Sequence, residues 1–409
     1  MREGVRAEVG DIPALDGLRG IAVIWVVAFH FAVLREGDAW VGALHGLPAL
    51  DALVRSGYLG VDLFFLLSGF LLALPWIAHA NAGLPPPSTR AFYRRRARRI
   101  LPAYYVQLVL LFAVVLPLLL GRTYWRKDLY VYLWNGVAHG LFLQGTTPLT
   151  SGSMGINGAL WTLPLEVQFY LLLPFAAPLF LRAPRRMLAG AIALSLAWQW
   201  AAAHDLAPLV ALELRLGAHW HWAEATVREM LAAQLPAFLG HFALGIVLAR
   251  AWLARRGRGR WPGAPLAAAA GAALLAVSIA GLVPLPPEHM RIVPLAALTL
   301  LFYAAVANRA KVVALVLGRG PLALAGRISY SAYLCHLPIL AAWNPRPSIF
   351  AGWASLPGFA LVLFTVSWIS WRWIEQPFLR GRGADRRASP SPLLSDAADA
   401  DSPATGIPR

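Results

Sequence analysis

The sequence has little cysteine and few charged residues. Its 409 residues include one cysteine, Cys335, so a disulfide within the chain and a metal site built from several thiolates are both excluded. Charged residues make up 14% of the chain and hydrophobic residues 58%, and no polar stretch is long enough for a large soluble domain. The net charge of +16 therefore does not indicate a nucleic-acid partner, because such binders concentrate their charge on a polar domain.

Long apolar runs recur along the whole chain instead. About 20 apolar residues cross the hydrocarbon core of a membrane as a helix. The pattern predicts an all-α, multi-pass membrane protein with ten spans in one bundle, and we expect the run at 130–145 to be a re-entrant or surface helix. The predicted spans are 17–35, 58–78, 100–120, 161–181, 187–203, 229–249, 264–283, 292–306, 322–343 and 353–371.

The distribution of Lys and Arg predicts the orientation of these spans. With ten spans, most of the basic residues fall in the loops of one side, such as "RAPRR" and "ARRGRGR", and the positive-inside rule makes that side cytoplasmic. Both termini are then cytoplasmic, and we expect the protein in the inner or plasma membrane. We place the transmembrane domain at 11–380 and expect a disordered cytoplasmic tail at 381–409, which is rich in Pro, Ser, Ala and Asp.

Ionisable residues inside the predicted spans are the first candidates for function, because each is costly in lipid unless it is paired or faces water. His30, Asp62, Glu166 and His336 come from four different spans. By helical rise, all four fall within roughly 5–11 Å of the outer membrane boundary. Any one of them alone is as well explained by a satisfied core group, but four at one depth favour a reaction site.

Arginines mark the opposite, cytoplasmic side. Arg19 precedes His30 by eleven residues, so the two point nearly the same way on one helix and lie ~16 Å apart. Arginine binds phosphate oxygens through paired hydrogen bonds, although a basic run also commonly anchors a span. The predicted phosphate site consists of Arg19, Arg94, Arg95, Arg96, Arg98 and Arg99.

Six segments resemble, in order, the landmarks of the membrane acyltransferase-3 family, which includes O-antigen and other polysaccharide O-acetylases. They are "LDGLRGIAVIWVVAFH", "GVDLFFLLSGFL", "FYRRRARRILPAYY", "LWTLPLEVQFYLLLP", "GRISYSAYLCHLPIL" and "WIEQPFLR". One departure is Val167, which stands where the family commonly has a second acidic residue, so Glu166 is the only acid of that motif.

The resemblance implies a membrane O-acyltransferase that moves an acyl group, often acetyl in this family, from acyl-coenzyme A to a hydroxyl of a carbohydrate or glycolipid. The expected partners are acyl-CoA as donor substrate, a carbohydrate or lipid-linked glycan, and membrane lipids, with no permanently bound cofactor and no metal. We predict that His30 is the general base and that Asp62 or Glu166 orients its imidazole. We expect Ser68, Tyr170 and His336 to contact substrate, with the phosphates of the donor on the arginines.

Two alternatives follow from the same residues. Intramembrane histidines and acids also build proton relays, so a proton-coupled exporter or a glycan or lipid flippase is the second hypothesis. The internal repeats and broken helices common in transporters are not evident in the sequence. The third is an acyltransferase that acts on a small-molecule acceptor, such as a secondary metabolite.

Overall fold

The computed structural model describes residues 12, 14–120, 129–145, 157–216, 223–256, 261, 263–284, 290–307, 316–343 and 352–379. These residues form helices and turns, with no strand among them. Six helical segments are long and apolar enough to cross a membrane. They are Ala14–Leu34, Pro48–Asn81, Thr89–Leu118, Gly158–Arg182, Glu224–Arg255 and Gly352–Leu379.

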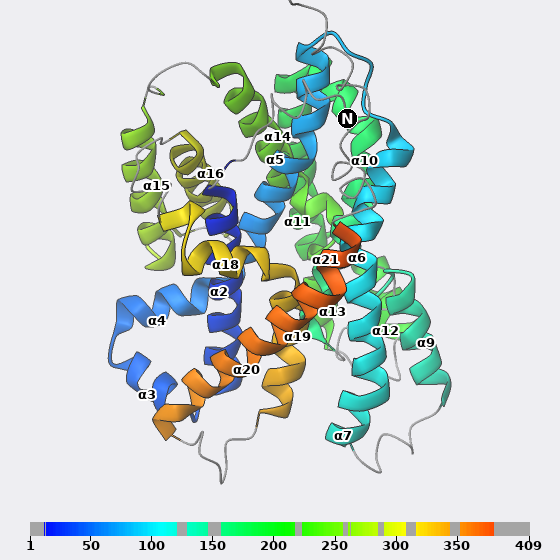
Figure 1. Ribbon diagram of the computed structural model, residues 1–409, viewed down its shortest axis with the longest axis vertical. Helices are drawn as coiled ribbons and strands as arrows, with labels where there is room; N and C mark the ends of the chain where they lie inside the picture. The colour runs from blue at the N-terminus through cyan, green and yellow to red at the C-terminus, as the bar shows by residue number, and fades with distance from the viewer. Residues whose placement is uncertain are drawn as a thin grey trace, which may run out of the picture.

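The centre of the bundle is built from α2 (Ala14–Leu34), α5 (Leu59–Asn81) and α14 (Leu235–Arg255), and Figure 1 shows α5 beside α14. Glycines let these helices touch through their backbones. A Cβ atom at Gly69 would lie 2.2 Å from the Phe242 carbonyl oxygen, and one at Gly245 would lie 2.3 Å from the Leu66 oxygen. At Gly60 it would lie 2.5 Å from the Ala22 oxygen. The small residues of "GVDLFFLLSGF" thus permit close helix approach, as the sequence suggests.

Further helices surround this centre. The third candidate span is α6 (Thr89–Leu110), continued by the π-helical η2 (Leu111–Val115) and by α7 (Leu116–Leu120). The remaining elements are α3 (Ala39–His45), α4 (Pro48–Arg55), η1 (Ser56–Tyr58), α9 (Leu129–Gly140), η4 (Gly158–Trp161), α10 (Thr162–Arg182), α11 (Pro184–His204), α12 (Ala207–Leu216), α13 (Glu224–Ala232), α15 (Ala264–Ile279), α16 (Ile292–Ala307), α18 (Pro321–Arg327), α19 (Ser329–Ala342), η7 (Gly352–Ala354), α20 (Ser355–Ser370), η8 (Trp371–Glu375) and α21 (Gln376–Leu379).

All ten predicted spans fall on helices, but the number of ten membrane crossings is not confirmed. Helices α15 and α16 have 16 residues each, and α11 is not among the six candidate spans. The predicted span 322–343 is divided into α18 and α19 at Ile328. The ambiguous run at 130–145 is helical as α9 over most of its length. The predicted tail, 381–409, lies outside the described residues.

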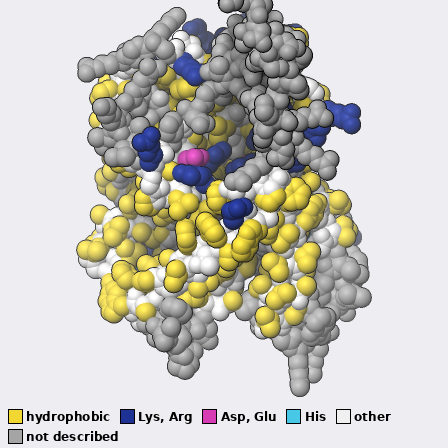
Figure 2. All heavy atoms as spheres, viewed as in Figure 1, with side chains coloured by type: hydrophobic (Ala, Val, Ile, Leu, Met, Phe, Trp, Pro, Cys, Tyr) yellow, Lys and Arg dark blue, Asp and Glu magenta, His cyan; other side chains and the backbone are white. Residues whose placement is uncertain are grey.

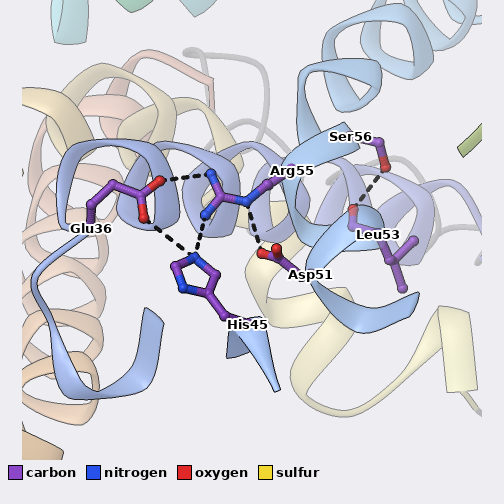
Figure 3. Close-up of polar contacts among 6 residues, drawn as sticks. All are labelled: Glu36, His45, Asp51, Leu53, Arg55 and Ser56. Carbon is purple, nitrogen blue, oxygen red and sulfur yellow. Dashed lines mark hydrogen bonds and ion pairs between the residues drawn. The ribbon is translucent and has the colours of Figure 1, made fainter. Parts of the chain in front are cut away.

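The two ends of α2 differ in chemistry, and this difference positions the site. Arg19 lies near the start of α2, and we call this the arginine end of the bundle. At the opposite end, Arg55 of α4 donates hydrogen bonds to Asp51, Glu36 and His45 (Figure 3). Asp38 caps α3 by accepting a hydrogen bond from the Trp40 amide, a common helix-start contact.

Candidate active site

A cavity of about 100 Å³ runs through the middle of the bundle from the arginine end. On α5 its wall extends from Leu72 to Val61, which is about 16 Å at the helical rise. The wall is apolar along α5 except at Ser68, and it is more polar where α10 and α19 face it. The lining residues are Arg19, Val61, Phe64, Phe65, Leu67, Ser68, Leu71, Leu72, Arg96, Arg99, Ile100, Thr162, Leu163, Glu166, Tyr170, Ser329, Tyr330 and Tyr333.

The entrance to this cavity is strongly basic. A wider space of about 330 Å³ shares Arg19, Arg96 and Arg99 with the cavity and adds Arg95 and Arg98. We call these five residues the arginine mouth. Figure 2 shows Lys and Arg side chains gathered in the upper half of the molecule, above a broad band of hydrophobic side chains. Arg94, the sixth predicted phosphate ligand, is exposed and lines neither space.

Few acids accompany these cations. Arg19 lies 3.5 Å from Asp16, but Arg95, Arg96, Arg98 and Arg99 form no ion pair with any carboxylate of the described residues. The Arg96 guanidinium lies 6.0 Å from the ring centroids of both Phe92 and Tyr170, a cation–π arrangement that orients it. Its Nε is buried without a hydrogen-bond partner. The mouth therefore presents unneutralised cationic donors to the cavity.

Glu166 lies on the cavity wall with two other predicted site residues. The Tyr170 hydroxyl donates a short hydrogen bond to Glu166, and the Ser68 hydroxyl lies 3.4 Å from the same oxygen. Helical spacing explains the first contact, because residues four apart share a helix face. The structure thus brings Glu166, predicted to orient His30, together with Ser68 and Tyr170, predicted to contact substrate. Its contacts do not include His30.

His30 is paired with the other predicted histidine. Its Nδ1 lies 3.2 Å from Nε2 of His336 and 2.9 Å from the Val26 carbonyl oxygen. His336 is fully buried, and its Nδ1 lies 2.8 Å from the Tyr333 carbonyl oxygen. The His336 side chain thus contacts His30. It does not line the cavity, as a residue that contacts the substrate there would.

These contacts determine the tautomers of both rings. A carbonyl oxygen only accepts, so Nδ1 of His336 carries the proton and its Nε2 is an acceptor. His30 must then donate from its own Nδ1, which leaves Nε2 of His30 as the unprotonated nitrogen. That nitrogen makes no hydrogen bond to any described residue, so it is the ring atom open to a substrate proton.

Asp62 belongs to a different group, and the prediction that it orients His30 is wrong. Its Oδ1 accepts a hydrogen bond from Arg291 at 2.6 Å and lies 3.1 Å from Nε2 of His241. Asp62 and His241 are buried, at 1% and 2% side-chain exposure. The Arg291 guanidinium also lies over the rings of Tyr58 and Phe238. Arg291 and His241 both contact Oδ1 of the carboxylate, and Oδ2 is buried without a hydrogen-bond partner among the described residues. Neither oxygen contacts His30.

The four groups predicted to form one cluster are therefore divided into three sets of contacts. His241 is not among the predicted site residues. It is nevertheless an ionisable residue inside a predicted apolar span, which is the property that selected the others. Arg291 lies between two predicted spans, so this criterion does not select it, and Thr162 and Tyr333 carry no charge. Their positions depend on tertiary contacts between α5, α10, α14 and α19, which no local pattern specifies.

Comparison with known proteins identifies the family. The acyltransferase-3 profile, described as an acyltransferase domain, matches residues 12–372. The chain belongs to the acyltransferase-3 family. Family membership makes this multi-pass membrane protein an acyltransferase, and the two predictions, family and enzyme class, are confirmed. No solved structure matches the chain.

Curated relatives are similar over part of the chain. A peptidoglycan O-acetyltransferase, OatA of Listeria monocytogenes, is 30% identical over 193 residues, which are 44% of this chain and 26% of that protein. Acyltransferase MdmB of Streptomyces mycarofaciens is 33% identical over 183 residues, 43% of this chain and 42% of its own. Regulator of hypoxia-inducible factor 1 of Caenorhabditis elegans is 26% identical over 200 residues, which are 46% of this chain and 38% of that protein. The chain thus matches less than half the length of each of these relatives.

Proposed function

We propose that this acyltransferase moves an acyl group, acetyl in the first instance, from cytoplasmic acyl-CoA to a hydroxyl of a carbohydrate or lipid-linked glycan in the inner or plasma membrane. The observation that carries the proposal is the cavity itself, which begins at the arginine mouth and extends about 16 Å toward the His30–His336 pair. Relatives named as peptidoglycan O-acetyltransferases support a carbohydrate acceptor. No observation favours transport over transfer.

The arginine mouth suits the phosphates of coenzyme A. Guanidinium groups bind phosphate oxygens through charge-assisted, often paired hydrogen bonds, and four of the five mouth arginines have no carboxylate to compete. The narrow cavity then receives the pantetheine arm, with the thioester directed toward His30. The polar wall formed by Ser68, Glu166 and Tyr170 offers hydrogen bonds to the amide groups of that arm.

His30 performs the proton transfer in this proposal. Its free Nε2 takes the proton of the acceptor hydroxyl while the oxygen attacks the thioester carbonyl. The tetrahedral intermediate collapses with cleavage of the carbon–sulfur bond, and the imidazolium returns the proton to the leaving thiolate. His336 is the positioning residue, because its Nε2 and the Val26 carbonyl oxygen both lie within hydrogen-bond distance of His30 Nδ1 and together keep the ring in the tautomer that the reaction needs.

The test is transfer of labelled acetyl from acetyl-CoA into the glycan fraction of membranes that contain the protein. His30→Ala is expected to lower the initial rate by about 10²- to 10⁴-fold, the usual contribution of a general base. His79→Ala is the matched control, because His79 is exposed and outside the cavity wall. Most of the activity surviving in His30→Ala, at an unchanged protein level, would falsify the assignment of His30.

A further inference from the structure

On α19 the lining of the cavity stops one helical turn short of His336. On α19 the lining includes Ser329, Tyr330 and Tyr333 but not His336, the next residue on that face. On α5 the last lining residue is Val61, and on α10 it is Thr162. The inner end of the donor cavity therefore has a wall next to the histidine pair. In the proposed reaction the acyl chain ends against this wall, while the thioester carbonyl has to reach His30 beside it.

Tyr333 occupies this end wall. Its ring lies between the two compartments, with a centroid distance of 6.1 Å to Phe64 on the cavity side and 5.6 Å to His336 on the other. The Tyr333 side chain is buried, at 8% exposure. No other ring among the described residues both lines the cavity and lies against His336, so the tyrosine ring forms the part of the end wall that adjoins the histidine pair.

Hydrogen bonds hold the ring in this position. The Tyr333 hydroxyl donates to the Ala159 carbonyl oxygen at 2.8 Å, which uses its only proton. The Thr162 hydroxyl, also 2.8 Å away, then donates to the Tyr333 oxygen. Both partners lie where η4 leads into α10, so the hydroxyl ties α19 to the start of α10 across the end of the cavity.

We propose that Tyr333 is a specificity-determining residue that sets the acyl length of the donor. The inference rests on the proposed function, because it assumes that an acyl thioester enters from the arginine mouth. The cavity volume of about 100 Å³ must hold the end of a thin arm and its acyl group. An apolar cavity of about 150 Å³ holds one benzene molecule, so little room remains for more than a few carbon atoms. The substrate class is short-chain acyl-CoA, with acetyl as the best fit.

Binding to the purified full-length protein in detergent tests this inference without knowledge of the acceptor. The probes are radiolabelled acetyl-CoA, butyryl-CoA and hexanoyl-CoA in equilibrium dialysis. The wild-type protein is expected to bind hexanoyl-CoA at least about tenfold more weakly than acetyl-CoA, because a packed wall does not yield to added methylenes without strain. Equal affinities for the two thioesters would overturn the proposal, and this measurement requires no variant to fold.

Two substitutions distinguish the role of the Tyr333 ring from that of its hydroxyl. Tyr333→Ala removes the wall and is expected to bring the hexanoyl-to-acetyl affinity ratio close to one. Tyr333→Phe keeps the ring and is expected to preserve the wild-type preference for acetyl. Tyr93→Ala is the matched control, because Tyr93 also donates to a carbonyl oxygen, of Leu171, but does not line the cavity. An unchanged chain-length preference in folded Tyr333→Ala would refute the assignment.

The same experiment distinguishes this inference from the proposed function. If no acyl-CoA binds to the wild-type protein, the donor assignment itself fails. If acetyl-CoA binds and chain length has no effect, only the role of Tyr333 fails.

Discussion

The arginines at the two ends of the bundle have different partners. At the opposite end, Arg55 contacts Asp51 and Glu36, and elsewhere in the bundle, away from the mouth, Arg291 contacts Asp62. At the arginine mouth, Arg95, Arg96, Arg98 and Arg99 contact no carboxylate of the described chain. A cation that the protein itself neutralises stabilises the fold, whereas a group of cations left without acids presents a binding site for an external anion.

The largest effect is expected from removing charge at the mouth. The double variant Arg96→Ala/Arg99→Ala is expected to raise the KM for acetyl-CoA by about 100-fold or more, because each of the two lost charge-assisted hydrogen bonds contributes about 1.5–3 kcal/mol. Initial rates of acetyl transfer measure this change. Arg55→Ala, which removes a charge from the opposite end, should leave the KM within about twofold of wild type, since its contacts are local. A double variant with a wild-type KM contradicts the comparison.

The next effect concerns Asp62, whose loss leaves Arg291 and His241 without their acid. Asp62→Asn is expected to lower the free energy of unfolding by about 2–3 kcal/mol, below the full cost of breaking a buried pair because Arg291 is 32% exposed. Thermal unfolding in detergent measures the shift. Asp51→Asn provides the control at a more exposed pair, and equal losses from the two variants would show that burial of Asp62 has no energetic consequence.

A smaller effect is expected from Arg55→Ala. The three partners of Arg55 are solvent-accessible, with Glu36 at 52% side-chain exposure, and surface ion pairs contribute about 0–1 kcal/mol. We expect a lowering of the midpoint temperature by a few degrees at most and no change in acyl transfer per folded molecule. A loss of activity without a loss of folded protein would show that Arg55 and its partners take part in the reaction. The arginines at the two ends of the bundle would then not differ in function.

The smallest effect is a pH dependence at Glu36. The hydrogen bond from Arg55 lowers the pKa of the Glu36 carboxyl in the folded state. Its ionised form therefore stabilises the protein above the unfolded pKa of about 4.3, and this contribution is lost as the pH falls through the lower, folded pKa. The difference in midpoint temperature between wild type and Glu36→Gln should narrow from pH 7 toward acid. A constant difference over that range would exclude the effect.

Local pattern predicts the helices and the arginine mouth well. Apolar runs predict the long helices α2, α5 and α10 within three residues at each end, because length and hydropathy are local properties. The span predicted at 229–249 is six residues too early at both ends for α14. Arg19 and His30 lie on one continuous helix, and the helical period alone relates them. The five mouth arginines are also found by sequence, since four of them belong to one basic run on α6.

The pairing of the buried polar groups is less predictable. His30 and His336 are 306 positions apart, and Asp62 and Arg291 are 229 apart. The sequence shows that each costs energy unless it has a partner, but the choice of partner depends on which helices adjoin. Asp62 was expected beside His30, yet Arg291, from the start of α16, offers it a full charge rather than a neutral ring.

The close contact between α5 and α14 has a consequence for mutational scanning. No side chain fits at Gly69 or Gly245, since even a methyl group would overlap a backbone oxygen of the other helix. Substitutions at these positions are expected to abolish activity as fully as those at His30, although neither glycine is among the residues that line the cavity. Protein abundance measured alongside activity tells the two kinds of intolerance apart: glycine variants lose the protein itself, and histidine variants keep it in the membrane.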